Sequence, residues 1–407
     1  MSSAPDRASS RALIRIVATL ALLVGLLASS PVANAEKPAK GPAGAAFYSP
    51  PKSFPTAQGK LIWHRRAGGL SPIDGAASND LVLYTSKTPQ GKTVAVSGSV
   101  SVPKGNPPKG GWPVITYGHG TTGIADSCAP SRVTAGSPVA PYVDYIDPEL
   151  ADWVGAGYAV VRTDYQGLGT PGDHPYLIGS AEGRGMLDIV SAARQLDPDI
   201  GKRYLIAGHS QGGHAALFAA GEANDYSPGL KLRGTVAFAP ASHILSQAQA
   251  LPAFTSPSAL SALAALIVKG ASTATATVDV PQLLSDQALA LFPQVDGTCL
   301  PQLSASDSFG GIAPADLIRD GADTGPLYGV LETENPDVKT KAPVLLAQGT
   351  ADTTVYKVFT DQLDDELTAA GDDVTYEVFD GVDHGGIPSA AEGDALKFFE
   401  KRLPPKG

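Results

Sequence analysis

Cysteine is scarce in this chain, with only Cys128 and Cys299 among 407 residues. No metal site can be built from two cysteines alone, because structural zinc usually takes four ligands. The seven histidines include no HExxH pair. The sequence therefore predicts no metal site and no other cofactor.

Charged residues are also few, at 17% of the chain, and acidic residues outnumber basic ones by 40 to 30. The net charge of −10 has the wrong sign for binding a phosphate backbone, so no nucleic acid is expected as a partner. Low charge together with a hydrophobic content of 43% excludes a disordered or coiled-coil protein and predicts a large buried core.

No apolar run has the length of about 20 residues that a transmembrane helix needs. The apolar residues 16–28 follow three arginines and precede a small-residue cleavage site ending at Ala35. Residues 1–35 are therefore predicted to be a signal peptide, and the mature protein to be secreted, without a transmembrane segment. In that oxidising environment Cys128 and Cys299 are expected to form a disulfide, with two free buried thiols as the alternative.

Strand-like and helical segments alternate from residue 81 onward. Residues 81–88 and 92–102 alternate apolar with polar or small side chains around a Pro-Gln-Gly turn and predict a β-hairpin. Further strands are predicted at residues 113–117, 158–163, 204–207, 235–239, 343–347 and 374–379. This alternation indicates an α/β fold with a mostly parallel central sheet that helices cover on both faces.

The interval between residues 239 and 343 is too long for a single crossover connection. Residues 258–269 and 281–292 within it are rich in Ala and Leu at helical spacing. They predict a helical cap inserted over residues 242–324, although apolar helices of this kind also suit an ordinary core. The core would then comprise residues 36–241, of which 36–58 lie along the surface, and residues 325–407.

The segment Gly208-His209-Ser210-Gln211-Gly212 matches G-x-S-x-G. In a chain with 45 glycines this match alone is a weak signal, and a glycine-rich structural turn is the alternative. The context is more specific, because a predicted strand precedes the motif and helix-forming residues follow it. A strand, a sharp turn and a helix lift a serine hydroxyl above the sheet, so Ser210 is predicted to be a nucleophile.

A serine nucleophile needs a histidine base, and in this architecture the histidine lies in a loop after a late strand. Three histidines follow Ser210. His214 belongs to the helix after the motif and His243 to the start of the cap, whereas His384 follows the last predicted strand. We therefore assign His384 as the base, with a surface or loop-capping histidine as the alternative.

The carboxylate that orients the base should follow the preceding strand. Asp352 comes after the strand at residues 343–347 and a glycine turn, and it is the predicted acid. Asp380 and Asp383 are interpreted as turn residues that accept backbone N–H bonds. Asp383, which adjoins His384, is kept as the alternative acid.

The oxyanion formed during attack needs two backbone N–H donors. Gln211, the residue after the nucleophile, is predicted to supply one. The glycine-rich residues 118–123 follow an early strand, and Gly120 or Thr121 would supply the second. A glycine-rich turn without a catalytic role is the alternative for this loop.

Several segments of the chain occur together in one family. They are Ala46-Phe47-Tyr48 with Pro50-Pro51, Tyr117-Gly118-His119-Gly120-Thr121, Asp164-Tyr165-Gln166-Gly167-Leu168-Gly169 and Gly208-His209-Ser210-Gln211-Gly212-Gly213. With them the chain resembles the secretory lipase family, the yeast lipase A group and its actinobacterial relatives in the α/β-hydrolase superfamily. The resemblance implies an α/β-hydrolase with a cap after the sixth strand, acting on carboxylic esters including triacylglycerols. It also implies Ser210, Asp352 and His384 as nucleophile, acid and base.

The leading hypothesis is a secreted lipase or carboxylesterase that forms an acyl-enzyme on Ser210 from small-molecule or lipid esters. A serine peptidase on the same fold is the second hypothesis, and it would need an anionic group to hold the amino terminus of a peptide. A non-catalytic binding protein is the third, which the presence of all three triad residues disfavours. The sequence does not specify an oligomeric state, and a monomer is compatible with it.

Overall fold

A nine-stranded sheet forms the centre of the computed structural model, which describes residues 38–405. The strands are Leu61–Arg66 (β1), Ser78–Lys87 (β2), Thr93–Val102 (β3), Trp112–Gly118 (β4), Ala159–Thr163 (β5), Ile200–His209 (β6), Lys231–Phe238 (β7), Val344–Gly349 (β8) and Val374–Phe379 (β9). Their spatial order is β1-β2-β3-β5-β4-β6-β7-β8-β9. In this spatial order, every neighbouring pair from β5 to β9 is parallel, including both pairs of β4. The pairs β1-β2, β2-β3 and β3-β5 are antiparallel. The predicted mostly parallel sheet is confirmed.

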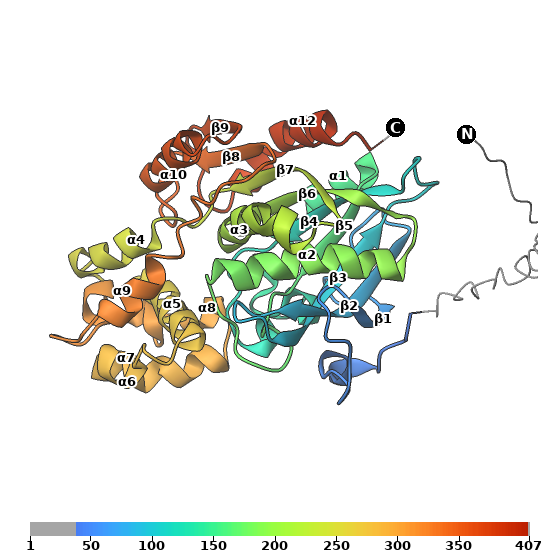
Figure 1. The fold of residues 1–407 in the computed structure, drawn as a ribbon. Coiled ribbons are helices and arrows are strands. Elements are labelled where there is room, and N and C mark those ends of the chain that lie inside the picture. The colour runs from blue at the N-terminus through green and yellow to red at the C-terminus, as the bar shows by residue number, and fades with distance from the viewer. Residues whose placement is uncertain (1–37, 406–407) are drawn as a thin grey trace, which may run out of the picture. The chain divides into compact units, whose positions relative to one another are not determined.

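Helices cover both faces of this sheet (Figure 1). Helices α2 (Gly179–Leu196) and α3 (Gln211–Tyr226) pack on one face, and α1 (Asp147–Ala156) and α12 (Glu392–Arg402) on the other. Successive strand residues point to opposite faces, so Val114 belongs to the first of these hydrophobic clusters and Ile115 to the second. Helix α10 (Lys357–Ala369) packs against β8 and β9, and the short α11 (Ile387–Ala390) precedes α12.

The N-terminal part of the described chain differs from the sequence-based expectation. Strand β1 was not predicted, because its residues run from apolar to basic without the alternation of a half-buried strand. The preceding residues do not lie wholly along the surface either. The 3₁₀ helix Gly44–Tyr48 (η1) buries Phe47 and Tyr48, and Phe47 packs near Trp63 of β1.

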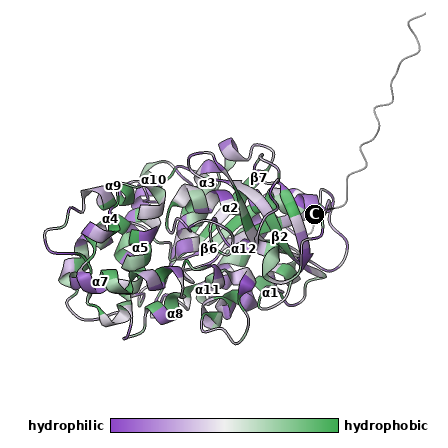
Figure 2. Ribbon diagram, turned by 90° about the horizontal axis from the view of Figure 1, so that it is seen from below, coloured by the Kyte–Doolittle hydropathy of each residue, from purple (hydrophilic) through white to green (hydrophobic). Residues whose placement is uncertain are grey.

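Only helices and loops lie between β7 and β8 in this part of the structure. The α-helices of this interval, here called the cap helices, are α4 (Ile244–Ala250), α5 (Leu260–Ala274), α6 (Val280–Leu283), α7 (Asp286–Leu291), α8 (Leu300–Leu303) and α9 (Gly325–Leu331). They share a hydrophobic cluster separate from those of the sheet. Figure 2 shows hydrophobic residues along α4, α5 and α9 as well as on the strands. The exact division at residues 242 and 324 stays a prediction.

The remaining helices of the described chain are short 3₁₀ turns. They are Asp126–Cys128 (η2), Pro130–Arg132 (η3), Ala140–Tyr142 (η4), Asp144–Ile146 (η5), Leu251–Ala253 (η6), Phe292–Asp296 (η7), Phe309–Gly311 (η8) and Pro314–Asp316 (η9). None of the helices within residues 38–405 is both long and apolar enough to cross a membrane. The predicted signal peptide, residues 1–35, and its cleavage site at Ala35 lie outside the described residues.

Candidate active site

Ser210 lies at the sharp turn between β6 and α3. Its φ of 58° is in the left-handed region, which a non-glycine residue occupies only where the surrounding structure enforces it. The flanking glycines allow this turn to form. A Cβ atom on Gly208 would clash with the carbonyl oxygen of Gly212, and one on Gly212 would clash with that of Gly118. The motif therefore needs glycines because the backbone segments at Gly208, Gly212 and Gly118 approach one another closely.

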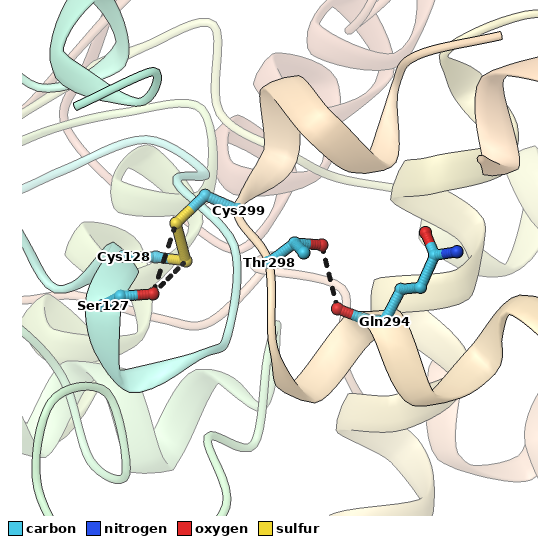
Figure 3. Close-up of a disulfide and its surroundings, with 5 residues drawn as sticks. All are labelled: Ser127, Cys128, Gln294, Thr298 and Cys299. Atoms are coloured by element: carbon cyan, nitrogen blue, oxygen red, sulfur yellow. Dashed lines mark hydrogen bonds between the residues drawn. A yellow bond between two sulfur atoms is a disulfide. The ribbon is translucent and has the colours of Figure 1, made fainter. Parts of the chain in front are cut away.

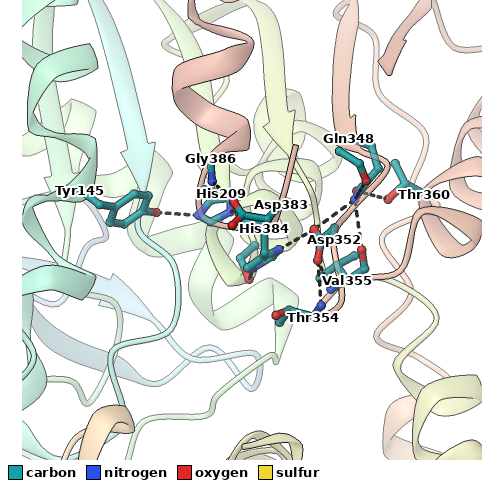
Figure 4. Close-up of polar contacts among 12 residues, drawn as sticks. Tyr145, His209, Gln348, Asp352, Thr354, Val355, Thr360, Asp383, His384 and Gly386 are labelled. Atoms are coloured by element: carbon teal, nitrogen blue, oxygen red, sulfur yellow. Dashed lines mark hydrogen bonds and ion pairs between the residues drawn. The ribbon is translucent and has the colours of Figure 1, made fainter. Parts of the chain in front are cut away.

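The structure brings Ser210, His384 and Asp352 into one hydrogen-bonded row. Nε2 of His384 lies 2.9 Å from Oγ of Ser210, and Nδ1 of the same ring lies 2.7 Å from Oδ2 of Asp352. The three residues follow β6, β9 and β8, so they meet at the carboxyl edge of the parallel strands. Figure 4 shows the imidazole of His384 beside the carboxylate of Asp352.

Asp352 is held as a carboxylate by its surroundings. Burial tends to raise the pKa of this carboxyl, but the hydrogen bond and charge of His384 and two backbone N–H bonds outweigh burial, and the pKa of Asp352 is lowered. The N–H groups of Thr354 and Val355 each donate to Oδ1 at 2.8 Å. An ionised Asp352 accepts Nδ1–H of His384, which leaves the lone pair of Nε2 facing the serine hydroxyl.

The residues considered as alternatives to Asp352 and His384 form hydrogen bonds with other parts of the protein. Oδ1 of Asp383 accepts the N–H of Gly386 at 2.8 Å, which makes a turn within the loop, and Asp380 accepts the hydroxyl of Thr350. The ring of His214 bonds the carbonyl oxygen of Glu334 inside the protein, and that of His243 bonds Glu366.

The predicted oxyanion residues lie around Ser210. Gly120 and Thr121 line the same cavity as the serine, and the hydroxyl of Thr121 lies 2.6 Å from that of Tyr176. Gln211 is the first residue of α3, and its side chain turns away to donate to Glu182 at 2.7 Å. Within the described chain, the backbone N–H groups of Gln211 and Thr121 have no backbone acceptor. Their role as oxyanion donors stays a prediction.

A cavity of about 720 Å³ opens over Ser210 and His384. Its walls are mostly apolar and come largely from the cap helices, including Ile244, Leu263, Ile267 and Leu327. No Asp, Glu, Lys or Arg is among the described residues that line it. The cavity is therefore suited to an uncharged, hydrophobic group next to the serine hydroxyl.

Cys128 of η2 and Cys299, just before α8, form the expected disulfide (Figure 3). A backbone bridge between Gly123 and Cys299 lies beside it. The cap helices are thus joined covalently to the segment that follows Gly120 and Thr121.

Two residues near this row did not emerge from the sequence, one bonded to it and one bonded to the first. His209 occupies a variable position of G-x-S-x-G, and its ring bonds the backbone of His384 at 2.9 Å. Tyr145 of η5 bonds His209, but it lies 64 residues away in a segment without a motif. The only available signal was a histidine placed directly before the nucleophile.

The chain is similar to known lipases and esterases. Residues 145–305 match the family model described as Secretory lipase. Lipase A of Moesziomyces aphidis is 28% identical over 311 residues, which cover 71% of this chain and 62% of that protein. The chain thus spans less than two thirds of the length of this curated relative.

Solved structures share the fold at lower identity. Lipase A of Candida antarctica in its closed state superposes with a TM-score of 0.71 at 21% identity, covering 85% of this chain and 82% of that one. The rice cell wall degrading esterase LipA from Xanthomonas oryzae gives a TM-score of 0.67 at 18% identity, covering 85% and 98%. The predicted α/β-hydrolase fold and the resemblance to the secretory lipase family are confirmed.

Proposed function

We propose that this relative of the secretory lipases is a serine hydrolase that cleaves carboxylic esters through an acyl-enzyme on Ser210. The observation that carries the proposal is the row from Ser210 Oγ to His384 Nε2 at 2.9 Å and from His384 Nδ1 to Asp352 Oδ2 at 2.7 Å. In the proposal Ser210 is the nucleophile, His384 the general base and Asp352 the carboxylate that orients it. No cofactor takes part.

The reaction follows from these positions. His384 takes the proton of Ser210 as Oγ bonds to the ester carbonyl carbon, and the N–H groups of Gln211 and of Thr121 or Gly120 stabilise the oxyanion. The tetrahedral intermediate collapses when the C–O bond to the alcohol breaks and His384 gives its proton to the leaving oxygen. Water, deprotonated by the same histidine, then attacks the acyl-enzyme and releases the carboxylic acid and Ser210.

The cavity supports lipid esters as the substrate class. Burial of each acyl methylene contributes about 0.8 kcal/mol, and the apolar walls over Ser210 offer that burial. Triacylglycerols and simpler acyl esters both fit this description, as in a triacylglycerol lipase or carboxylesterase. A peptidase would need an anion to hold the amino terminus of its substrate, and no described lining residue of the cavity carries a carboxylate.

Secretion is part of the proposal. The description of the matched family as secretory and the disulfide between Cys128 and Cys299 both support an extracellular location. The small-molecule or lipid ester would then be met outside the cell.

The experiment that tests the function is the hydrolysis of p-nitrophenyl butyrate and tributyrin by wild type and Ser210→Ala. We expect the variant to lose on the order of 10⁴-fold in kcat while remaining folded, because the covalent step is removed. A phosphonate probe followed by peptide mass spectrometry should label Ser210. The exposed Ser389 of α11 provides a matched control, since Ser389→Ala should retain full activity. Activity of Ser210→Ala within tenfold of wild type would falsify the assignment.

A further inference from the structure

His209 precedes the proposed nucleophile and is only 4% exposed. Each nitrogen of its ring has one partner. Nδ1 lies 2.6 Å from the hydroxyl oxygen of Tyr145, and Nε2 lies 2.9 Å from the backbone carbonyl oxygen of His384. Figure 4 shows the Tyr145 hydroxyl directed at the His209 ring, with His384 beside that ring.

These partners determine which nitrogen carries the proton. A carbonyl oxygen only accepts, so Nε2 of His209 carries a proton and donates to His384. Burial lowers the pKa of His209 well below its usual value, and the neighbouring His384 lowers it further, so the ring is neutral. Nδ1 therefore has a lone pair, and the Tyr145 hydroxyl donates to it. The two contacts together select a single tautomer.

The ring of His209 also contacts two other parts of the site. Its centroid lies 4.6 Å from that of the His384 ring, with the planes tilted by 41°. A Cβ atom on Gly120 would lie 3.5 Å both from Nδ1 of His209 and from the hydroxyl oxygen of Tyr145. The predicted oxyanion loop, the nucleophile turn and the loop of the base thus meet at one side chain.

The loop that carries His384 follows β9, which is an edge strand of the sheet. Apart from the bonds of the His384 ring to Ser210 and Asp352, the loop is bonded to itself, through Asp383 and Gly386, and to the loop after β8, through Val382 and Ala351. The bond from His209 joins it instead to the end of β6 near the centre of the sheet. A small displacement of this loop would change the 2.9 Å separation of Ser210 and His384, and a misplacement of about 1 Å can cost about 10²-fold in rate.

We propose that His209 is a positioning residue that holds the backbone of His384, and that Tyr145 keeps His209 in the tautomer this requires. The proposal rests on the proposed function, because it concerns the same nucleophile and base. It predicts an effect on the chemical step, since the two bonds set the position of the base.

The test compares kcat and KM for p-nitrophenyl butyrate among full-length variants. His209→Leu removes the donor and should lower kcat by roughly 10- to 100-fold with KM changed less than about threefold. His209→Gln places an N–H at a similar distance from the backbone and should restore kcat to within about fivefold of wild type. A role in packing alone would not distinguish these two variants.

Tyr145→Phe gives a second measurement, because it changes only a hydroxyl. It should lower kcat by about three- to tenfold in the wild-type background and have no further effect in His209→Leu, since its action passes through the histidine. If His209→Leu fails to fold, the double-mutant cycle is run with His209→Gln in its place, using Tyr145→Phe, His209→Gln and Tyr145→Phe/His209→Gln. Tyr145→Phe should then have no further effect in His209→Gln, since its action passes through the histidine.

Each outcome has one reading. Wild-type kcat in a folded His209→Leu, no rescue by glutamine, or a silent Tyr145→Phe overturns the positioning role. Ser210→Ala is assayed in parallel to separate the two proposals. If Ser210→Ala is active, the proposed function itself fails; if it is inactive while His209→Leu has the wild-type rate, only the positioning role fails.

Discussion

The backbone N–H of Leu300 donates to the carbonyl oxygen of Thr122 at 2.9 Å. Leu300 begins α8 and Thr122 follows the predicted oxyanion residue Thr121, so a cap helix is hydrogen-bonded directly to the predicted oxyanion loop. The disulfide of Cys128 and Cys299 lies beside this bond. The cap helices, which line the cavity, and the predicted oxyanion loop are therefore connected by a backbone hydrogen bond, with a disulfide beside it.

Reduction of the disulfide should destabilise the protein and loosen the cap. In the chain-entropy model, closure of a loop of 171 residues contributes at most about 5 kcal/mol. We expect a lower melting temperature and a change in KM larger than that in kcat. Thermal unfolding and ester hydrolysis with and without reductant measure both effects. The double variant Cys128→Ser/Cys299→Ser should behave like the reduced protein and not respond to reductant. Two thiols per chain in the unreduced, unfolded protein would contradict the prediction.

The two candidate acids should respond differently to loss of charge. Asp352→Asn should lower kcat by on the order of 10⁴-fold, because the amide no longer orients and stabilises the His384 ring. Asp383→Asn keeps an oxygen that can accept the N–H of Gly386 and should stay within about threefold of wild type. Steady-state kinetics of the two variants decide between them. A nearly silent Asp352→Asn together with a crippling Asp383→Asn would transfer the role to Asp383.

The lowered pKa of Asp352 predicts a specific acid dependence of stability. A carboxyl with a lower pKa in the folded than in the unfolded state stabilises the fold above its unfolded value, about 4. That contribution is lost as the pH falls from about 4 through the lowered folded pKa. The free energies of unfolding of wild type and Asp352→Asn, measured by urea denaturation from pH 7 downward, should therefore converge below pH 4. A difference that stays constant to pH 2 would argue against an ionised Asp352.

The buried side chain of Glu182, which bonds the residue after Ser210, should be important for stability. Glu182 of α2 accepts N–H groups from Leu177 and Gln211, and its other oxygen lies 3.6 Å from Nδ1 of His214. The side chains of Glu182 and His214 are fully buried, so Glu182→Ala, which leaves the N–H donors of Leu177 and Gln211 without this acceptor, should destabilise the fold by roughly 2–5 kcal/mol. Glu182→Gln should be milder, because its amide can still accept from Gln211 and can donate to Nδ1 of His214. Denaturation midpoints of the two variants check the order, and equal losses would show that the carboxylate, which both variants lack, accounts for the whole effect.

The cavity predicts how rate depends on acyl length. Among p-nitrophenyl esters from acetate to palmitate, kcat/KM should rise until the chain fills the cavity and then level off. Because the cap is fastened to the core by the disulfide, we expect no jump in rate when tributyrin passes its solubility limit. Ala264 of α5 lines the cavity, and Ala264→Trp should shift the optimum to shorter chains without changing acetate hydrolysis. A sharp rise at saturation would show that the cap opens as a lid, and an unchanged optimum in Ala264→Trp would place the acyl chain elsewhere.

Much of the fold could be read from local patterns. The β-rich runs at residues 343–347 and 374–379 and the alternation at 81–102 indicated strands, because side-chain type and periodicity reflect which face is buried. Strand β1 could not be found in this way, since its residues are at most partly buried, and Ile62 and Trp63 become so only when Phe47 and β2 pack against them. The row of Ser210, Asp352 and His384 was proposed from chain order, since parallel strands present their following loops at one edge.

The sequence by itself determined the fold class and the strand, turn and helix around Ser210, and it limited the candidate partners of Ser210 to a few residues. Local chemistry suffices there, because the turn requires glycines and the strands require apolar residues. The tertiary structure alone decided that Asp352 faces the ring of His384 while Asp383 closes a turn. Only the tertiary structure showed that Tyr145 bonds His209 and that His209 bonds the backbone of His384. The contacts of Asp352 with His384, of Tyr145 with His209 and of His209 with His384 connect residues 32 to 175 positions apart. No local pattern encodes them, because they arise only when the strand ends are packed together.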